Sequence, residues 1–408
     1  MFSKFFPDSK NLYLNDRHEE ADTHKEDRRK LYDKRILPLL EENDFTIFGE
    51  KIDPFLRDYY KNLGLAKIKP ANIFYTDSYL NYPSLTKAVL ADKNLIQRLK
   101  KEKFYFLMPY IESYDAGKLA GEIGAFLFRS SEFTDWINNK SNYREILKEL
   151  KLPIIPGYQT NLEKAEGHFN ELKNQGFKKV VLKKERSISG FSVFVIEKEG
   201  DFSQCLKDNF SEQKSFVLEG FIEDVKYSPN FQYFITENNV EFIVATDQLL
   251  EKDGVSYSGN LYPSFLIKKP AIWKTINEMS EKICDYLQRK RCFGLAGIDY
   301  IVTGQGKVYS TEVNARLNGS TFPALIAEKL FGEGVNIHWL FKTFHFKSTS
   351  FENLFNKFKY FIKKRGEIGI LPVGVDLLES MSEGQFMIIT ENRKRLDDLY
   401  KEFCSFKL

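Results

Sequence analysis

The chain has 408 residues, and its 60 Lys and Arg nearly balance its 57 Asp and Glu, which leaves a net charge of +3. This balance gives no argument for nucleic acid or an acidic membrane surface as a partner, so we expect no nucleic acid. The length is too great for one small core and predicts two to four subdomains.

The cysteines and the apolar runs indicate the cellular setting of the protein. The four cysteines, Cys205, Cys284, Cys292 and Cys404, form no C-x-x-C pair and are interpreted as reduced thiols. No apolar run approaches the roughly 18 residues of a membrane span. The first ten residues lack the apolar core of a signal peptide. We therefore expect a cytoplasmic protein without a transmembrane segment.

The first third of the chain alternates short apolar runs with helical spacing. Residues 45–49 and 104–110 are typical of buried strands, and residues 85–101 have the spacing of a helix. Because such alternation favours a parallel sheet, we expect a small α/β domain over residues 1–137.

The middle of the chain predicts a longer series of elements. A helix over residues 141–150 is stopped by Pro153 and Pro156. Periodicity and β-branched content predict further helices at 164–175 and 270–290, and strands at 180–184, 191–196, 216–222, 231–236 and 240–250.

Residues 297–316 carry the clearest chemical pattern, because two strands, 297–302 and 308–316, are joined by a turn. If residues 304–307 form the loop, Asp299 lies opposite Glu312, with Cβ atoms about 5 Å apart. Side chains alternate along a strand, so Glu312, Asn314 and Arg316 share one face.

Two opposed carboxylates repel each other unless one is protonated or a cation lies between them. Mg²⁺ held by one or two carboxylates and by phosphate oxygens fits this arrangement. Arg316, next along the same face, suits a phosphate or a carboxylate. The pattern predicts metal-assisted phosphate chemistry, and a surface hairpin with solvated charges is the alternative.

Two further segments suit a nucleotide. Between strands 180–184 and 191–196, Ser189, Gly190 and backbone N–H groups can wrap phosphate oxygens, with Lys183 as a point charge against them. An ordinary hairpin with an exposed lysine is the alternative. Glu219 follows three apolar residues in a strand that could line an adenine pocket with its backbone groups.

In combination these motifs resemble the ATP-grasp family, whose pattern appears in order at Lys140, Lys183, Glu219, Asp299, Glu312, Asn314 and Arg316. The match covers roughly residues 138–330. Residues 228–232, 246–248 and 258–263 look more closely like carboxylate–amine ligases of peptide and natural-product pathways.

The resemblance implies an α/β (α+β) fold of the ATP-grasp type. It implies a Rossmann-like α/β domain at residues 1–137, a small lid subdomain at 138–215, a nucleotide- and metal-binding core at 216–335 and a small C-terminal extension at 336–408.

By the same resemblance, the protein is an ATP-dependent ligase that forms an amide or peptide bond through an acyl phosphate and releases ADP and phosphate. Mg²⁺, or Mn²⁺, would assist ATP. The substrates would be a small carboxylate and an amine, amino acids or a peptide among them, and a carrier protein could present one of them. An ATP-dependent carboxylase and a non-catalytic nucleotide-binding protein stay open as alternatives.

The resemblance also assigns roles to individual residues. Nucleotide contacts are expected from Lys140, Lys183, Ser189, Gly190, Glu219, Ile222 and Gln232. Metal ligands are expected at Asp299, Glu312 and Asn314, and catalytic roles at Arg316 and Lys183.

The C-terminal part contains an amphipathic stretch at residues 351–365, in which aromatic residues follow helical spacing beside several lysines. We interpret it as a surface helix packed on the body, with a docking face for a carrier protein or a membrane surface as the alternative.

Overall fold

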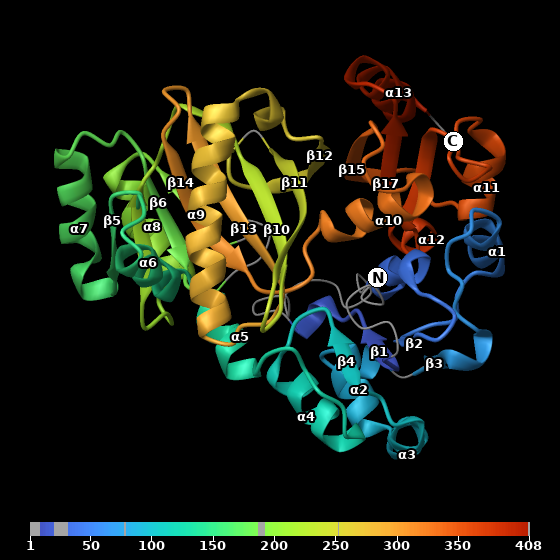
Figure 1. Cartoon of the computed structure of the whole chain (residues 1–408). Helices are drawn as coiled ribbons and strands as arrows, with labels where there is room; N and C mark the ends of the chain where they lie inside the picture. Colours follow the sequence, from blue (N-terminus) through green and yellow to red (C-terminus); the bar gives the residue numbers. More distant parts are fainter. Residues whose placement is uncertain (1–8, 20–31, 77–78, 187–191, 252, 407–408) are drawn as a thin grey trace.

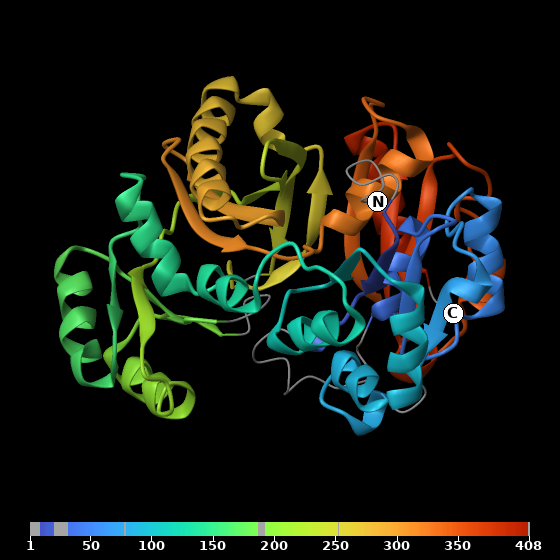
Figure 2. The same ribbon diagram turned by 60° about the horizontal axis from the view of Figure 1, so that its bottom comes forward.

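The computed structural model describes residues 9–19, 32–76, 79–186, 192–251 and 253–406. Within these residues the strands form two sheets of four strands and one of nine. One small sheet with its helices lies at one end of the molecule, and the N- and C-terminal strands lie at the other (Figures 1 and 2). The mixed α/β class is confirmed.

The N-terminal part contains a parallel sheet, as predicted, and its strand order is β3-β2-β1-β4. The helix expected over residues 85–101 is divided at Asp92, whose side chain accepts the N–H of Leu95 and begins a second helix. The elements are β1 (Asn11–Leu14), η2 (Arg17–Glu19), η4 (Asp33–Leu39), β2 (Phe45–Phe48), α1 (Pro54–Asn62), η5 (Pro70–Asn72), β3 (Ile73–Tyr75), η6 (Tyr79–Asn81), α2 (Leu85–Ala91), α3 (Lys93–Glu102), β4 (Phe106–Pro109), α4 (Tyr114–Ile123) and α5 (Ser131–Ile137).

The second small sheet is antiparallel, with the strand order β5-β8-β6-β7, and we call residues 157–220 the lid. Helix α6 (Lys140–Glu149) precedes it and is capped by the side chain of Asn139. The lid contains β5 (Gly157–Thr160), α7 (Leu162–Asn174), β6 (Val180–Lys184), β7 (Val193–Ile196), α8 (Glu199–Asn209) and β8 (Phe216–Gly220). Since β8 pairs with β5 and β6, this sheet extends past residue 215, where the sequence suggested a boundary.

The large sheet has the order β14-β13-β10-β11-β12-β15-β17-β16, and β9 pairs with β13. Helix α9 crosses one face (Figure 1), and its Ile276, Ile283 and Leu287 are buried at helical spacing. The elements are β9 (Val225–Tyr227), β10 (Pro229–Ile235), β11 (Val240–Leu250), β12 (Tyr257–Tyr262), η7 (Phe265–Lys268), α9 (Pro270–Arg289), β13 (Gly294–Thr303), β14 (Val308–Asn314), α10 (Thr321–Phe331), β15 (His338–His345), α11 (Phe351–Lys357), β16 (Gly369–Gly374), α12 (Leu378–Met381), β17 (Glu383–Thr390) and α13 (Arg393–Ser405).

The C-terminal residues continue the large sheet, because β15 pairs with β12. The amphipathic helix expected over residues 351–365 is shorter than predicted and ends at Lys357. Beyond it the backbone is extended at Phe358, and Phe361 forms a bridge with Ile370. Burial of Phe358 and Phe361 in the core replaces the helical hydrogen bonds as the stabilising interaction.

Four groups of buried apolar side chains hold the molecule together. The largest one joins η4 and α1 to α10 and the C-terminal strands. A second lies between α9 and the large sheet, and a third lies under the N-terminal helices. The lid has a core of its own, built from α7, α8 and strands β6 and β8. The lid is therefore packed as a separate unit.

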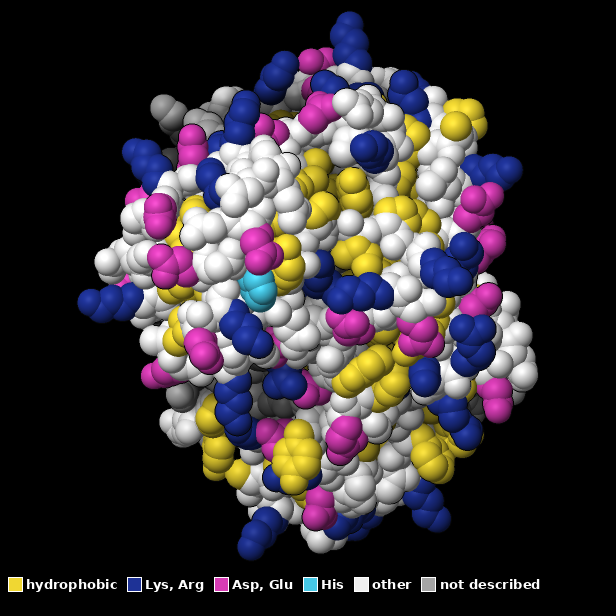
Figure 3. Space-filling model, turned by 90° about the vertical axis from the view of Figure 1, so that its left-hand side faces the viewer, with side chains coloured by type: hydrophobic (Ala, Val, Ile, Leu, Met, Phe, Trp, Pro, Cys, Tyr) yellow, Lys and Arg dark blue, Asp and Glu magenta, His cyan; other side chains and the backbone are white. Residues whose placement is uncertain are grey.

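No helix in the described part of the chain has both the length and the apolar character to cross a bilayer. On the face at the lid end, basic and acidic side chains are mixed and hydrophobic side chains gather in the upper half (Figure 3).

Candidate active site

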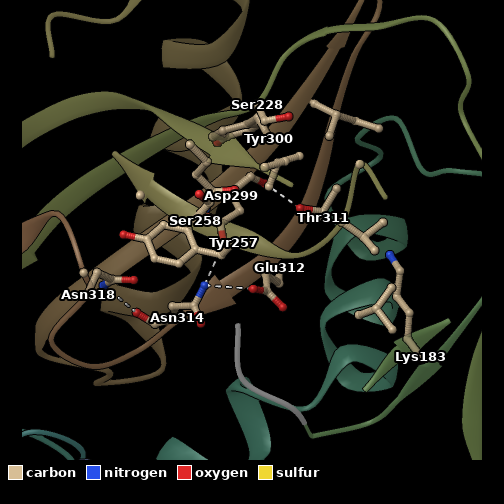
Figure 4. A pocket seen from close by; sticks show the side chains of 18 of the residues that line it. Lys183, Ser228, Tyr257, Ser258, Asp299, Tyr300, Thr311, Glu312, Asn314 and Asn318 are labelled. Carbon is tan, nitrogen blue, oxygen red and sulfur yellow. Dashed lines mark hydrogen bonds between the residues drawn. The ribbon is translucent and has the colours of Figure 1, made fainter. Parts of the chain in front are cut away.

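A cavity of about 410 Å³ lies between the lid, the large sheet and the N-terminal domain, within the roughly 300–1,000 Å³ typical of small-molecule sites. Lys183 and Glu219 line it from the lid. Asp299, Glu312 and Asn314 line it from the large sheet, across from Lys183 (Figure 4). The structure thus brings together residues that lie more than 100 positions apart in the chain.

The hairpin β13–β14 brings two carboxylates together. Asp299 pairs with Glu312 and residues 304–307 connect the strands, as predicted, but the predicted pairing next to the loop is wrong. Val302, and not Thr303, pairs with Val308, so the strands near the turn are shifted by one residue. A β-bulge at Thr311 adds one residue to β14 and restores the pairing of Asp299 with Glu312.

Amide side chains hold the Asp299 carboxylate in place. Asn230 Nδ2 donates to Asp299 Oδ1 at 2.6 Å, and Gln248 Nε2 donates to the same oxygen at 2.8 Å. Asn314 Nδ2 donates to Asp299 Oδ2 at 2.8 Å and to Glu312 Oε1 at 3.1 Å (Figure 4). Two carboxylates and three amides therefore share a single hydrogen-bonded cluster.

The electrostatics of this pair are asymmetric. Burial, together with the charge of Glu312, raises the pKa of Asp299 to about 7. Withdrawal from water acts to raise the pKa of Glu312 as well, but the Lys140 ammonium outweighs it and lowers that pKa to about 2. When Asp299 is ionised, its charge is therefore not fully compensated by the protein. A bound divalent cation would supply the missing positive charge.

The two predicted phosphate-binding lysines are paired with acids. Lys140 Nζ lies 2.9 Å from Glu312 Oε2, and Lys183 Nζ lies 2.6 Å from Glu219 Oε2. The alternative of an exposed lysine at position 183 does not hold, because its side chain is only 13% exposed, and that of Lys140 is 8% exposed. Both ammonium groups are held at the cavity wall by carboxylates.

Glu219 is the buried centre of a three-residue ion cluster. It pairs with Lys183 and also with Arg144, whose side chain is 7% exposed. Arg144 in addition donates to the carbonyl groups of Ile155 and Gly157. Burial acts to raise the pKa of Glu219, but Lys183 and Arg144 outweigh it and hold the pKa below its ordinary value. Glu219 therefore fixes the lid strand β6 to α6.

Beside this cluster the cavity wall becomes apolar, as an adenine ring requires. Ile155, Val181, Ile222 and Ile301 line it there. Ile222 lies where the sequence predicted a nucleotide contact. Ser189 and Gly190, the predicted phosphate cover, lie outside the described residues.

Arg316 lines the same cavity but not as a strand residue, because β14 ends at Asn314. Its Nη2 donates to Asn314 Oδ1 at 2.9 Å, and its Nη1 donates to the Leu317 carbonyl. Its guanidinium carbon lies 5.7 Å from the centre of the Tyr110 ring. Arg316 therefore orients the amide of the predicted metal site.

One predicted contact is not at the cavity. Gln232 is fully buried, donates to Asn230 Oδ1 at 2.9 Å and accepts from Thr321 at 2.7 Å. It lies on the same face of β10 as Asn230 and bonds to that residue, and it is not among the residues that line the cavity.

Sequence reasoning assigned no role to Asn230, Gln248, Arg144 and Arg35, all of which contact or line the site. The polar residues of segments 228–232 and 246–248 were the available signal for Asn230 and Gln248, because buried amides inside strands need partners. No local pattern marked Arg144 or Arg35.

Comparisons with known proteins agree with this geometry. The family model of the ATP-grasp domain matches residues 137–320. A curated relative, the butirosin acyl-carrier protein–L-glutamate ligase of Niallia circulans, is 29% identical over 199 residues, which are 47% of this chain and 46% of that protein. The chain therefore spans less than half of that relative in the match.

Solved structures extend the similarity to the whole fold. Biotin carboxylase from Campylobacter jejuni, in a complex with a nucleotide, has a TM-score of 0.62 at 15% identity, covering 95% of this chain and 89% of that chain. N5-carboxyaminoimidazole ribonucleotide synthetase from Thermus thermophilus has a TM-score of 0.61 at 12% identity, covering 97% and 98%. At these identities the likeness establishes the fold alone. By the family model, residues 137–320 form an ATP-grasp domain.

Proposed function

We propose that the protein is an ATP-dependent carboxylate–amine ligase that forms an amide bond through an acyl phosphate. The observation that carries the proposal is the shared cavity, in which two lysines, two carboxylates and Arg316 meet. A protein that only binds nucleotide has no need for an arginine beyond the metal ligands. The sequence relative is itself named as a ligase.

In the first step a carboxylate oxygen of the substrate attacks the γ-phosphorus of ATP, and the bond to the ADP oxygen breaks. In the second step the amine nitrogen attacks the acyl carbon, phosphate leaves with the C–O electron pair, and the nitrogen loses a proton. Lys140 and Lys183 would hold the phosphate oxygens, and Arg316 would bind the transferring phosphoryl group or the carboxylate. Catalysis would come from positioning and from charge neutralisation.

Asp299, Glu312 and Asn314 fit a Mg²⁺ or Mn²⁺ site. They offer carboxylate and amide oxygens, and the raised pKa of Asp299 reflects burial next to a second carboxylate. The ion would neutralise charge on the ATP phosphates. For that role the amide of Asn314 would turn its oxygen toward the ion, away from Arg316.

For the substrates, we propose a small carboxylate and an amine, with an amino acid as one of them. The relative from Niallia circulans joins L-glutamate to an acyl-carrier protein. A carrier-bound acceptor is therefore a candidate here too. A reaction that consumes ATP and a chain whose described cysteines are all free support a cytoplasmic setting.

Product analysis tests this function. The enzyme is incubated with ATP, Mg²⁺ and the amino acids singly and in pairs, with Asp299→Asn as the inactive control. We expect ADP and phosphate, and hydroxylamine should trap the acyl phosphate as a hydroxamate. AMP and pyrophosphate would overturn the acyl-phosphate mechanism. Bicarbonate-dependent ADP release without an amine would instead favour a carboxylase.

A further inference from the structure

Arg35 is a buried cation without a counter-charge in the part of the chain that the structure describes. The residue is only 5% exposed, yet it lines the cavity. No described carboxylate lies within 4.0 Å of it, and its Nε and Nη2 atoms are buried without a hydrogen-bond partner. A buried charge without a partner is unfavourable, so such a group is expected where a ligand supplies the missing charge.

Aromatic rings fix the orientation of the Arg35 guanidinium. Its central carbon lies 4.7 Å from the centre of the Phe322 ring, 5.6 Å from that of Tyr32 and 5.8 Å from that of Tyr110. Burial and the charge of Arg17 lower the pKa of Arg35 to about 10, which leaves it protonated near neutral pH. The two atoms without partners, Nε and Nη2, form one edge of the guanidinium, the fork that binds a carboxylate through two hydrogen bonds.

A buried acceptor lies close to the aliphatic part of the Arg35 side chain. Gln385 is 9% exposed, lines the cavity, and its Oε1 atom has no hydrogen-bond partner. A Cβ atom on Gly374 would lie 3.1 Å from Arg35 Cγ and 3.2 Å from Gln385 Oε1, so the two side chains meet above that glycine. Glu383 lies two residues before Gln385 on β17, so the two side chains are on the same face of the strand. Its carboxylate accepts a hydrogen bond from the Tyr32 hydroxyl.

A guanidinium group near an amide oxygen and a carboxylate can bind both charged groups of a free amino acid. We propose that Arg35, Gln385 and Glu383 form a subsite for the amino-acid substrate, in which Arg35 binds its α-carboxylate, and Gln385 and Glu383 bind its α-ammonium group. This inference rests on the proposed ligase function. The guanidinium groups of Arg35 and Arg316 lie over the same Tyr110 ring, at 5.8 and 5.7 Å. The amino acid would thus be held at one end while its reacting group extends toward Arg316.

The test measures binding as well as turnover. Thermal unfolding is followed with L-glutamate, with glutarate, which lacks the ammonium group, and with 4-aminobutyrate, which lacks the α-carboxylate. Any other amino acid that supports ADP release is treated in the same way. We expect the intact amino acid to raise the Tm of the wild-type protein, and each truncated analogue to raise it much less.

Variants separate recognition from structure. Arg35→Met removes an unpaired buried charge, so its Tm without ligand should equal or exceed that of the wild type. The amino-acid-induced rise in Tm should disappear, and KM for the amino acid should increase at least about tenfold, as for a lost charged hydrogen bond, with KM for ATP unchanged. Arg35→Lys and Gln385→Leu should show smaller losses of the same kind. Arg98→Gln, at an exposed arginine over Phe74, is the control.

The outcomes distinguish this inference from the ligase proposal. If the wild type releases ADP with an amino acid and Arg35→Met, Arg35→Lys and Gln385→Leu keep its KM, the subsite is wrong and the ligase stands. If Arg35→Met unfolds at a lower Tm without ligand and Arg35→Lys keeps the KM, Arg35 is structural and the subsite is wrong. If no substrate supports ADP release but Arg35-dependent binding of the amino acid is seen, the subsite stands and the ligase proposal fails.

Discussion

Lys140 Nζ lies 2.9 Å from Glu312 Oε2, so a predicted phosphate-binding cation is paired with a predicted metal ligand. In the proposed complex with ATP, Lys140 would contact a phosphate oxygen and Glu312 would contact the metal ion. Without ATP, the two side chains contact each other. Binding of ATP with its metal ion would move Lys140 to a phosphate oxygen and free the carboxylate for the ion. The pair therefore stabilises the site while it holds no nucleotide.

The first prediction concerns the carboxylate of this pair. Glu312→Gln keeps the shape and the hydrogen bonds but removes a charge. We expect turnover to fall by about 10²-fold or more, the scale of one lost electrostatic stabiliser. Steady-state ADP release at saturating Mg²⁺ measures it, with the exposed Glu281→Gln on α9 as the control. Near-normal turnover of Glu312→Gln would show that this carboxylate is structural.

The second prediction concerns the two lysines. Lys140→Met and Lys183→Met should each weaken ATP binding, because each removes a cation from the phosphate end of the cavity. Isothermal titration with a non-hydrolysable ATP analogue measures the affinity. Lys184→Met, next to Lys183 on β6 but not among the cavity-lining residues, is the control. Unchanged affinity in both variants would contradict the phosphate contacts.

The third prediction separates two roles of Glu219. Glu219→Gln leaves Lys183 and Arg144 buried without a counter-charge. We expect the free energy of unfolding to fall by about 3–5 kcal/mol, as for a broken buried ion pair. Urea denaturation measures it, and the half-exposed Glu223→Gln should change stability by no more than about 0.5 kcal/mol. Full stability with reduced ATP affinity would show instead that Glu219 acts mainly on the nucleotide.

The fourth prediction concerns pH. In the folded protein without metal, the pKa of Asp299 is raised to about 7, whereas an unfolded aspartate ionises near about pH 4. The folded state holds this proton more tightly, so the contribution of Asp299 to stability falls as pH rises from about 4 to about 7. Because Mg²⁺ compensates the ionised form, its effect on Tm should be larger near pH 8 than near pH 6. The difference should be absent in Asp299→Asn, and an equal effect at both pH values would contradict it.

The fifth prediction concerns Arg316. Arg316→Lys keeps the charge but loses the planar fork that donates to Asn314 and could bind a carboxylate. We expect ATP affinity within a few-fold of the wild type and loss of most ADP release, since the interaction strengthens as charge shifts during transfer. Normal turnover would remove the catalytic role. A joint loss of stability and ATP affinity would show that Arg316 has a structural role at the end of β14.

Local patterns predicted much of the site. The alternation of β-branched and polar residues in 297–314 indicated two strands, and Asp299 lies opposite Glu312 as expected. The pairing of Asp299 with Glu312 was correct although the pairing next to the loop was not, because the bulge at Thr311 compensates for the one-residue shift. A bulge depends on tertiary contacts of the sheet edge and has no reliable local signature. The domain limits at residues 138, 216 and 336 and the roles of the site residues stay predictions.

Residues that act across domains escaped sequence reasoning. Arg35 lies on a 3-10 helix that carries no recognised motif, and Gln385 lies 350 positions later on β17. Only the packing of η4 against the C-terminal strands brings them together. The amphipathic pattern at 351–365 failed for the same reason, because Phe351 packs against Phe55 of α1 and Phe361 packs against Phe386 of β17.

The separate core of the lid indicates where this protein can deform. The N-terminal domain, α10 and the C-terminal strands share one continuous core, and the cavity wall that carries Arg35 and Gln385 is built on it. The lid buries its own apolar side chains and contacts α6 through the Glu219 ion cluster. Movement of the lid as one body would therefore leave both cores intact.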